Sequence, residues 1–137
     1  MSQDKLDLTQ LDKTIRRLQE GLARYRSDVT DIQIRDGLIQ RFEFTYEISH
    51  KTLKRFLKLA SATPLEFDDM SFQELIRTAN ERELLLGDWP QWKGYRDMHS
   101  KTSQSYKEDV ALEVVAGIPG FLEEAVYLQK RLHERQA

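Results

Sequence analysis

The sequence predicts an all-α fold, a bundle of four to five helices in one domain that spans residues 1–137. Apolar residues recur at steps of three and four along most of the chain, as they do on one face of a helix. Capping patterns led by serine stand before two of these stretches, and no alternation of apolar and polar residues indicates a strand. With 137 residues, 39% of them hydrophobic and 32% charged, the chain can bury one core.

The first predicted helix runs from Thr9 to about Tyr25, and Asp7 or Thr9 supplies its capping oxygen. One face of this helix, its apolar stripe, carries Leu8, Leu11, Ile15, Leu18, Leu22 and Tyr25. The second predicted helix begins at Ile32 or Asp36 and ends near Ala60. Its apolar residues cover more than one side, which indicates a central position in the bundle or a subunit interface.

Residues 61–70 are predicted to form a loop, after which a capping box of Ser71 and Glu74 opens a short helix. Gly87 is predicted to end this region in a left-handed conformation, and Asp88 to start a fourth helix. A second capping box, Ser105-Tyr106-Lys107-Glu108, predicts the start of a last helix that reaches Leu132. Pro119 lies inside that helix, where a kink or break is expected.

Composition narrows the classes of function. The chain has no cysteine, which excludes disulfides, thiolate catalysis and cysteine zinc sites. Its 21 basic and 23 acidic residues give a net charge of −2, so RNA is a possible ligand but not a favoured one. The polar start MSQDKLDLTQ is unlike a secretory signal, and no apolar run approaches the roughly 20 residues that span a bilayer. A cytoplasmic location is therefore expected.

No metal or cofactor site is evident from local spacing. The three histidines are His50, His99 and His133, and none belongs to a strong metal-binding motif. His50 and Glu47 form at most a weak pair on one helix, and His133 is placed to complement a helix dipole. No glycine-rich phosphate loop is present. The expectation is that this chain alone binds no cofactor and no metal.

The segment from Asp88 to Tyr106 combines aromatic, cationic and amide side chains. Such a mixture can stack on a base and bind phosphate. In the alternative interpretation Trp89 and Trp92 are core anchors, and the polar residues after them are a helix end followed by a cap.

Four stretches carry a resemblance to the HEPN-type nucleotidyltransferase substrate-binding proteins. They are RFEFTYEISHKTLKRFL (41–57), MSFQELIRTANERELL (70–85), residues 92–106 and IPGFLEEAVYL (118–128). The resemblance implies an antiparallel bundle that dimerises and pairs with a separate minimal nucleotidyltransferase. The homodimer would sit within a heterotetramer, and the nucleotide and Mg²⁺ would belong to the partner subunit.

The ribonuclease toxins among these relatives share a motif of Arg, four residues, His, one residue and Tyr. When the motif is aligned on Tyr106, its His falls on Gln104 and its Arg on His99, while Ser103 fits the pattern. In those relatives the Tyr accepts AMP, which silences the toxin. An amide cannot exchange a proton near neutral pH, so Gln104 argues against acid–base catalysis. Arg96, one turn before His99, can lend positive charge.

Three hypotheses follow. In the first, the chain is a binding subunit, and Tyr106 is either near the acceptor of the nucleotide or the acceptor itself. In the second, it is a ribonuclease toxin whose candidate catalytic residues are His99, Arg96 and Gln104. In the third, it is a purely structural dimer. The predicted substrate or partner contacts are Trp92, Arg96, His99, Ser103, Gln104 and Tyr106, together with Glu43, Tyr46 and Glu47, which line either a pocket or a dimer seam.

Overall fold

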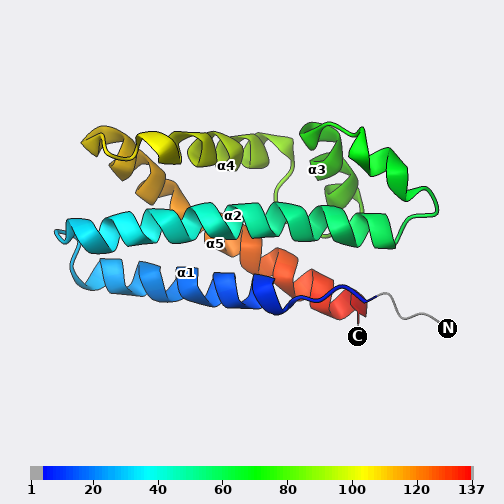
Figure 1. The fold of residues 1–137 in the computed structure, drawn as a ribbon, viewed down its shortest axis with the longest axis horizontal. Coiled ribbons are helices and arrows are strands. Elements are labelled where there is room, and N and C mark those ends of the chain that lie inside the picture. The colour runs from blue at the N-terminus through cyan, green and yellow to red at the C-terminus, as the bar shows by residue number, and fades with distance from the viewer. Residues whose placement is uncertain (1–4, 137) are drawn as a thin grey trace.

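The structure, a computed structural model, describes residues 5–136, which form five α-helices and two 3-10 helices without any strand (Figure 1). In chain order these are α1 (Thr9–Ser27), α2 (Ile32–Leu59), η1 (Pro64–Asp68), α3 (Phe72–Glu81), α4 (Trp89–Lys101), η2 (Thr102–Gln104) and α5 (Glu108–Gln136). The predicted all-α class is confirmed. Residues 1–4, on which part of the signal-sequence prediction depends, lie outside the described residues.

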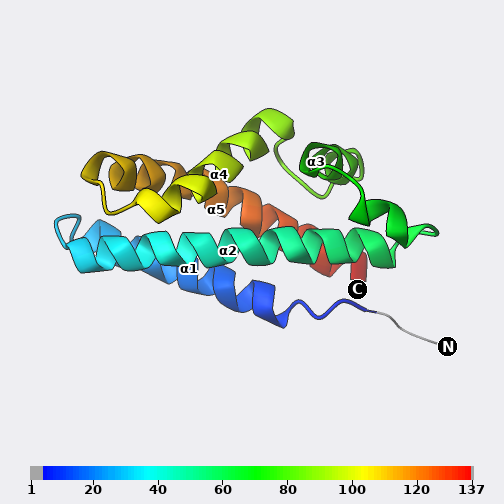
Figure 2. The same ribbon diagram turned by 45° about the horizontal axis from the view of Figure 1, so that its top comes forward.

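The long helix α2 is the centre of the arrangement. It runs antiparallel to α1 and lies between α1 and α4 in both views (Figures 1 and 2). Helix α5 packs against α1, α2 and α4, whereas the short α3 packs near the far end of α2. The central position that was one of two predictions for the second helix is therefore confirmed.

The core consists of the apolar faces predicted from helical spacing. The leucines and the isoleucine of the first-helix stripe are buried, whereas Tyr25 is partly buried and packs against the core. Helices α2 and α5 contribute their own buried rows: Leu38, Phe42, Leu53 and Leu57 from α2, and Val114, Ile118, Phe121, Ala125, Leu128 and Leu132 from α5. Phe44 of α2 points away from this core and keeps 52% of its surface exposed. Helix α2 thus has apolar surface that no part of residues 5–136 covers.

Helix α5 continues through Pro119, so of the predicted kink or break the break is wrong. Proline removes one amide from the helical ladder, and buried residues on both sides of it, such as Ile118 and Phe121, anchor the helix in the core. Gly117, two residues earlier, permits close contact between α5 and α4. A Cβ there would lie 2.5 Å from the sulfur of Met98, so a larger residue would require the Met98 side chain to shift.

Several predicted boundaries need correction. Helix α3 ends at Glu81, and Glu83, with φ of 63°, adopts the left-handed conformation that was predicted for Gly87. Lys107, not Ser105, immediately precedes α5, because a 3-10 turn first occupies Thr102–Gln104. The predicted loop 61–70 contains η1, which buries Phe67.

Two helix starts show their capping in detail. At α3, Ser71 Oγ accepts a hydrogen bond from the amide of Glu74 at 3.1 Å, and it donates to the Glu74 carboxylate at 3.0 Å. Only half of that predicted capping box forms. At α4 a complete box is present, since the Asp88 side chain accepts from the amide of Gln91 and the Asp88 amide donates to Gln91 Oε1 at 2.9 Å. Asp88 Oδ1 also accepts from the amide of Trp89 at 2.8 Å. This cap fixes the start of the helix that carries His99.

The first and last described segments are joined directly. The amide of Leu6 donates to Gln136 Oε1 at 2.7 Å, and Gln136 Nε2 donates to the carbonyl of Leu6 at 2.8 Å. The paired hydrogen bonds hold the segment before α1 against the end of α5. No helix among residues 5–136 has the length and apolar character needed to cross a bilayer.

Candidate functional site

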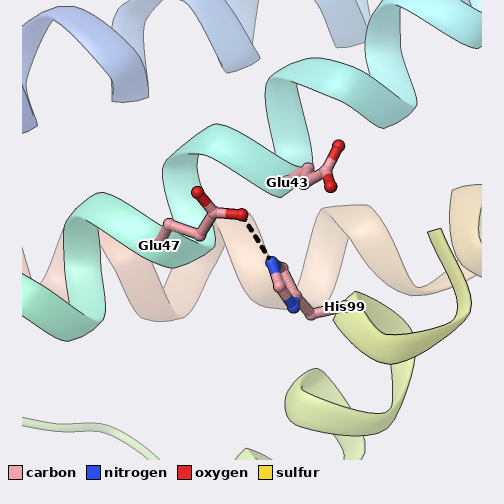
Figure 3. Close-up of side chains that lie close together, drawn as sticks. All are labelled: Glu43, Glu47 and His99. Carbon is pink, nitrogen blue, oxygen red and sulfur yellow. Dashed lines mark hydrogen bonds and ion pairs between the residues drawn. The ribbon is translucent and has the colours of Figure 1, made fainter. Parts of the chain in front are cut away.

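His99 lies on α4 where that helix faces α2 (Figure 3). Its Nε2 is 2.9 Å from Glu47 Oε2, and its ring stacks on Tyr46 with centroids 4.5 Å apart and planes 26° from parallel. Both partners come from α2, one residue apart. The hydrogen bond and the stacking together fix the position and the tilt of the imidazole ring.

Two carboxylates of α2 converge on this imidazole. Glu43 and Glu47 are one turn apart, and one ligand atom from each lies within 4.8 Å of the other and of a His99 nitrogen (Figure 3). Whether Glu43, Tyr46 and Glu47 line a pocket or a dimer seam was left open by the sequence. In the structure they share one polar cluster with His99.

An aromatic layer supports this cluster from the core side. Trp92 is fully buried and lies 6.4 Å from the Tyr46 ring and 6.1 Å from the Phe121 ring. The prediction that Trp92 contacts a substrate is wrong, because a side chain without exposed surface cannot meet a ligand; the core-anchor interpretation holds. Tyr46 is also mostly buried, and burial raises the pKa of its phenol to about 12. The Tyr46 phenol is therefore uncharged at physiological pH, and its ring positions the His99 ring by stacking.

Arg96 lies one turn before His99 and is exposed. Its guanidinium carbon is 5.9 Å from the centroid of the Phe72 ring. Its positive charge partly opposes the rise in the pKa of Tyr46 that burial causes, so Arg96 lies near the cluster. No ion pair within residues 5–136 involves Arg96. Its positive charge is available to an anionic ligand.

Ser103, Gln104 and Tyr106 form a second group, on the turn between α4 and α5. All three are exposed, and Tyr106 has 80% of its surface accessible. The turn is attached to the end of α4 by Thr102, whose buried hydroxyl donates to the carbonyl of His99 at 2.7 Å. No hydrogen bond within the described chain joins the side chains of this group to the His99 ring. The predicted site is thus divided between a helix face and a turn.

The other two histidines have structural contacts. His50 does not pair with Glu47, because Glu47 contacts His99 instead. The His50 ring lies edge-on to Phe72, and burial lowers the pKa of His50. His133 contacts Asp12 of α1 at 2.9 Å, a contact that the helix-dipole interpretation did not include.

A groove along α1 and α2 was missed by sequence reasoning. It has a volume of about 820 Å³, and its lining includes Lys13, Arg17, Arg41, Phe44 and Glu47. The groove therefore reaches one carboxylate of the His99 cluster and is otherwise rich in basic side chains. Because the lining comes from two helices, no spacing along one helix reveals the groove. The only signal in the sequence is that the apolar residues of α2 cover more than one side of that helix.

Glu124 of α5 is a second group that the sequence did not reveal. Its buried carboxylate accepts hydrogen bonds from the amides of Leu86 and Gly87, each at 2.7 Å. Burial raises its pKa, and these two hydrogen bonds partly oppose the shift. Glu124 holds the connection before α4 and thereby the start of the helix that carries His99.

The comparisons with known proteins agree on one family. The family model described as "Nucleotidyltransferase substrate binding protein like" matches residues 6–134. The chain is 34% identical to a Haemophilus influenzae protein named "Probable ribonuclease HepT", over 98% of this chain and 97% of that protein. A solved Haemophilus influenzae structure, whose title describes the fold of a substrate binding domain of a nucleotidyltransferase, superposes with a TM-score of 0.85 at 31% identity. That superposition covers 93% of this chain and 99% of the other. With nearly its whole length matched in sequence and in fold, the chain belongs to the nucleotidyltransferase substrate binding protein-like family.

Proposed function

We propose that this chain is the substrate-binding subunit of a cytoplasmic two-component nucleotidyltransferase, whose catalytic subunit is a separate minimal nucleotidyltransferase. The observation that carries the proposal is Gln104, an exposed amide at the position where ribonuclease relatives need a proton-transferring histidine. A chain of this family without that group is suited to recognition. The partner supplies the nucleotide, Mg²⁺ and the chemistry.

Tyr106 is the best-placed acceptor on this chain. Its ring is 80% exposed at the start of α5, and the ammonium of Lys107 lies 5.9 Å from the ring centroid. In the reaction the phenol oxygen bonds to the α-phosphorus of ATP on the partner, and the bond to pyrophosphate breaks. The phenolic proton passes to a base of the partner or to water. A nearby ammonium favours the approach of the negatively charged nucleotide.

Assembly as a homodimer within a heterotetramer is part of the proposal. Phe44 supports it, because this half-exposed aromatic side chain lies on the central helix beside a groove of about 820 Å³. Helix α2 then serves both the core and a subunit contact.

Native mass spectrometry of this chain, expressed together with a minimal nucleotidyltransferase from the same organism, tests the proposal. A complex of two copies of each chain is expected at micromolar concentration. Addition of ATP and Mg²⁺ should increase the mass of this chain by one AMP unit, and Tyr106→Phe should remove that increase without dissociating the complex. Separate species at that concentration would refute the two-component function.

A ribonuclease toxin is the second candidate, favoured by the name of the 34% identical relative. Under this alternative His99 and Arg96 act on RNA, and AMP transfer to Tyr106 neutralises the toxin. Incubation of the purified chain with RNA, beside His99→Ala, separates the two functions. We expect no cleavage by either protein; cleavage by the intact chain that His99→Ala abolishes would establish the ribonuclease.

A further inference from the structure

We propose that Glu43, Glu47 and His99 form a binding site for a first-row divalent metal ion, for which Zn²⁺ is the appropriate probe. One carboxylate oxygen from each glutamate and one imidazole nitrogen lie within 4.8 Å of one another (Figure 3). Imidazole nitrogen and carboxylate oxygen are both common zinc ligands. The inference concerns side chains of this chain alone and does not depend on the nucleotidyltransferase partner.

The geometry requires only small movements: the Glu47–His99 pair must open slightly, and Glu43 must approach. Ligand atoms around a tetrahedral Zn²⁺, with bonds of about 2.1 Å, lie about 3.4 Å apart. Glu47 Oε2 and His99 Nε2 are already 2.9 Å apart, so an ion would enter between them and replace their hydrogen bond. Glu43 has the longer way to move, and its flexible side chain, partly exposed on α2, allows that movement.

The surroundings distinguish this cluster from an ordinary ion pair. Glu43 and Glu47 repel one another across one helical turn, and no cation within residues 5–136 forms an ion pair with Glu43. A divalent ion would neutralise both carboxylates. The His99 ring is already held by its stacking on Tyr46, so a ligand nitrogen is presented with little loss of conformational freedom.

The donor set indicates which ions fit. An imidazole nitrogen ligand favours Zn²⁺, Ni²⁺ or Cu²⁺ over Mg²⁺ and Ca²⁺, which prefer all-oxygen sites. Three protein ligands leave at least one coordination position for water or another oxygen ligand. The side chains of His99 and Glu47 are 27% and 44% exposed, so this position is open to solvent. The toxin motif has an arginine where this chain has His99, and a guanidinium cannot ligate a metal.

Isothermal titration calorimetry with ZnCl₂ tests the site on the full chain, freed of any histidine tag. We expect one equivalent to bind with micromolar affinity, and MgCl₂ to give no signal that depends on His99. His99→Gln and Glu47→Gln should weaken binding by more than the roughly 10–100-fold typical of a lost outer-shell partner. His133→Gln is the matched control, because His133 is also 2.9 Å from a carboxylate but has no third ligand.

Glu43→Gln keeps the test decisive if the other variants unfold. Glu43 forms no ion pair in the described chain, so this variant should melt at the same temperature as the parent without metal, yet lose at least tenfold in zinc affinity. Zinc binding that is unchanged by both Glu43→Gln and His99→Gln would overturn the proposal. So would binding that His133→Gln weakens equally, or absence of binding to the parent chain.

Discussion

The inner face of α4 and the turn that follows this helix differ in burial. Its inner face carries Trp92, which is fully buried against aromatic side chains of α2 and α5, whereas the turn after it carries Tyr106, 80% exposed. His99 lies between these extremes and is held by contacts to α2. Core contacts and the proposed recognition site therefore occupy adjacent parts of one short segment, and substitutions should separate them.

Trp92→Ala tests the inner face and should have the largest effect. Loss of a buried tryptophan in a core costs about 3–5 kcal/mol of unfolding free energy, through lost burial and an unfilled cavity. Urea denaturation followed by circular dichroism measures it. Trp89→Ala is the control, because Trp89 is only half-buried, and its loss should be clearly smaller. Equal losses would show that burial does not distinguish the two faces.

Glu124→Ala tests the support at the start of α4, with an expected loss of about 2–3 kcal/mol of unfolding free energy, because the two amides of Leu86 and Gly87 lose their acceptor. The control is the exposed neighbour, and Glu123→Ala should change the unfolding free energy little.

The contribution of Glu124 to stability should also depend on pH. Because burial raises its folded-state pKa above the ordinary value of 4.5, the pH-dependent part of this stabilisation is fully present below that ordinary value. This part declines as pH rises through the folded-state pKa. The difference between Glu124→Ala and the parent chain should therefore be larger at pH 4.5 than at pH 8, and the opposite trend would contradict the raised pKa.

Tyr106→Phe should have the smallest effect on stability, within about 0.5 kcal/mol, since an exposed hydroxyl is removed. Its effect on nucleotide transfer should be complete, because the acceptor oxygen is absent. Thermal denaturation and the mass of the chain after incubation with partner, ATP and Mg²⁺ measure the two quantities. A stability loss comparable to that of Glu124→Ala would mean that the turn belongs to the structural part of α4.

The helices were predictable because their apolar faces follow a local period. The stripe from Leu11 to Leu22 and the row from Val114 to Leu132 are buried as expected. Boundaries were less predictable: the left-handed residue is Glu83 instead of Gly87, and a 3-10 turn replaces the cap at Ser105. Local preferences at these ends yield to the packing of the helices that follow.

The candidate site was only partly predictable for a related reason. His99, Glu43 and Glu47 were each singled out as site residues, but 52 positions separate Glu47 from His99, and only the packing of α4 on α2 brings them together. Trp92 shows the opposite failure, because an aromatic residue within a polar segment looks the same in sequence whether it is buried or exposed. Spacing along one helix carries no information about the surface that a second helix presents to it.

The two hydrogen bonds between Leu6 and Gln136 have a practical consequence for experiments on the proposed complex. Both described extremities of the chain lie together at one end of the bundle, while η2 lies at the other (Figure 1). A fluorophore, surface tether or fusion protein attached at either extremity would project away from Tyr106. Immobilised protein should consequently remain open to its partner, which makes binding kinetics measurable from both possible attachment points.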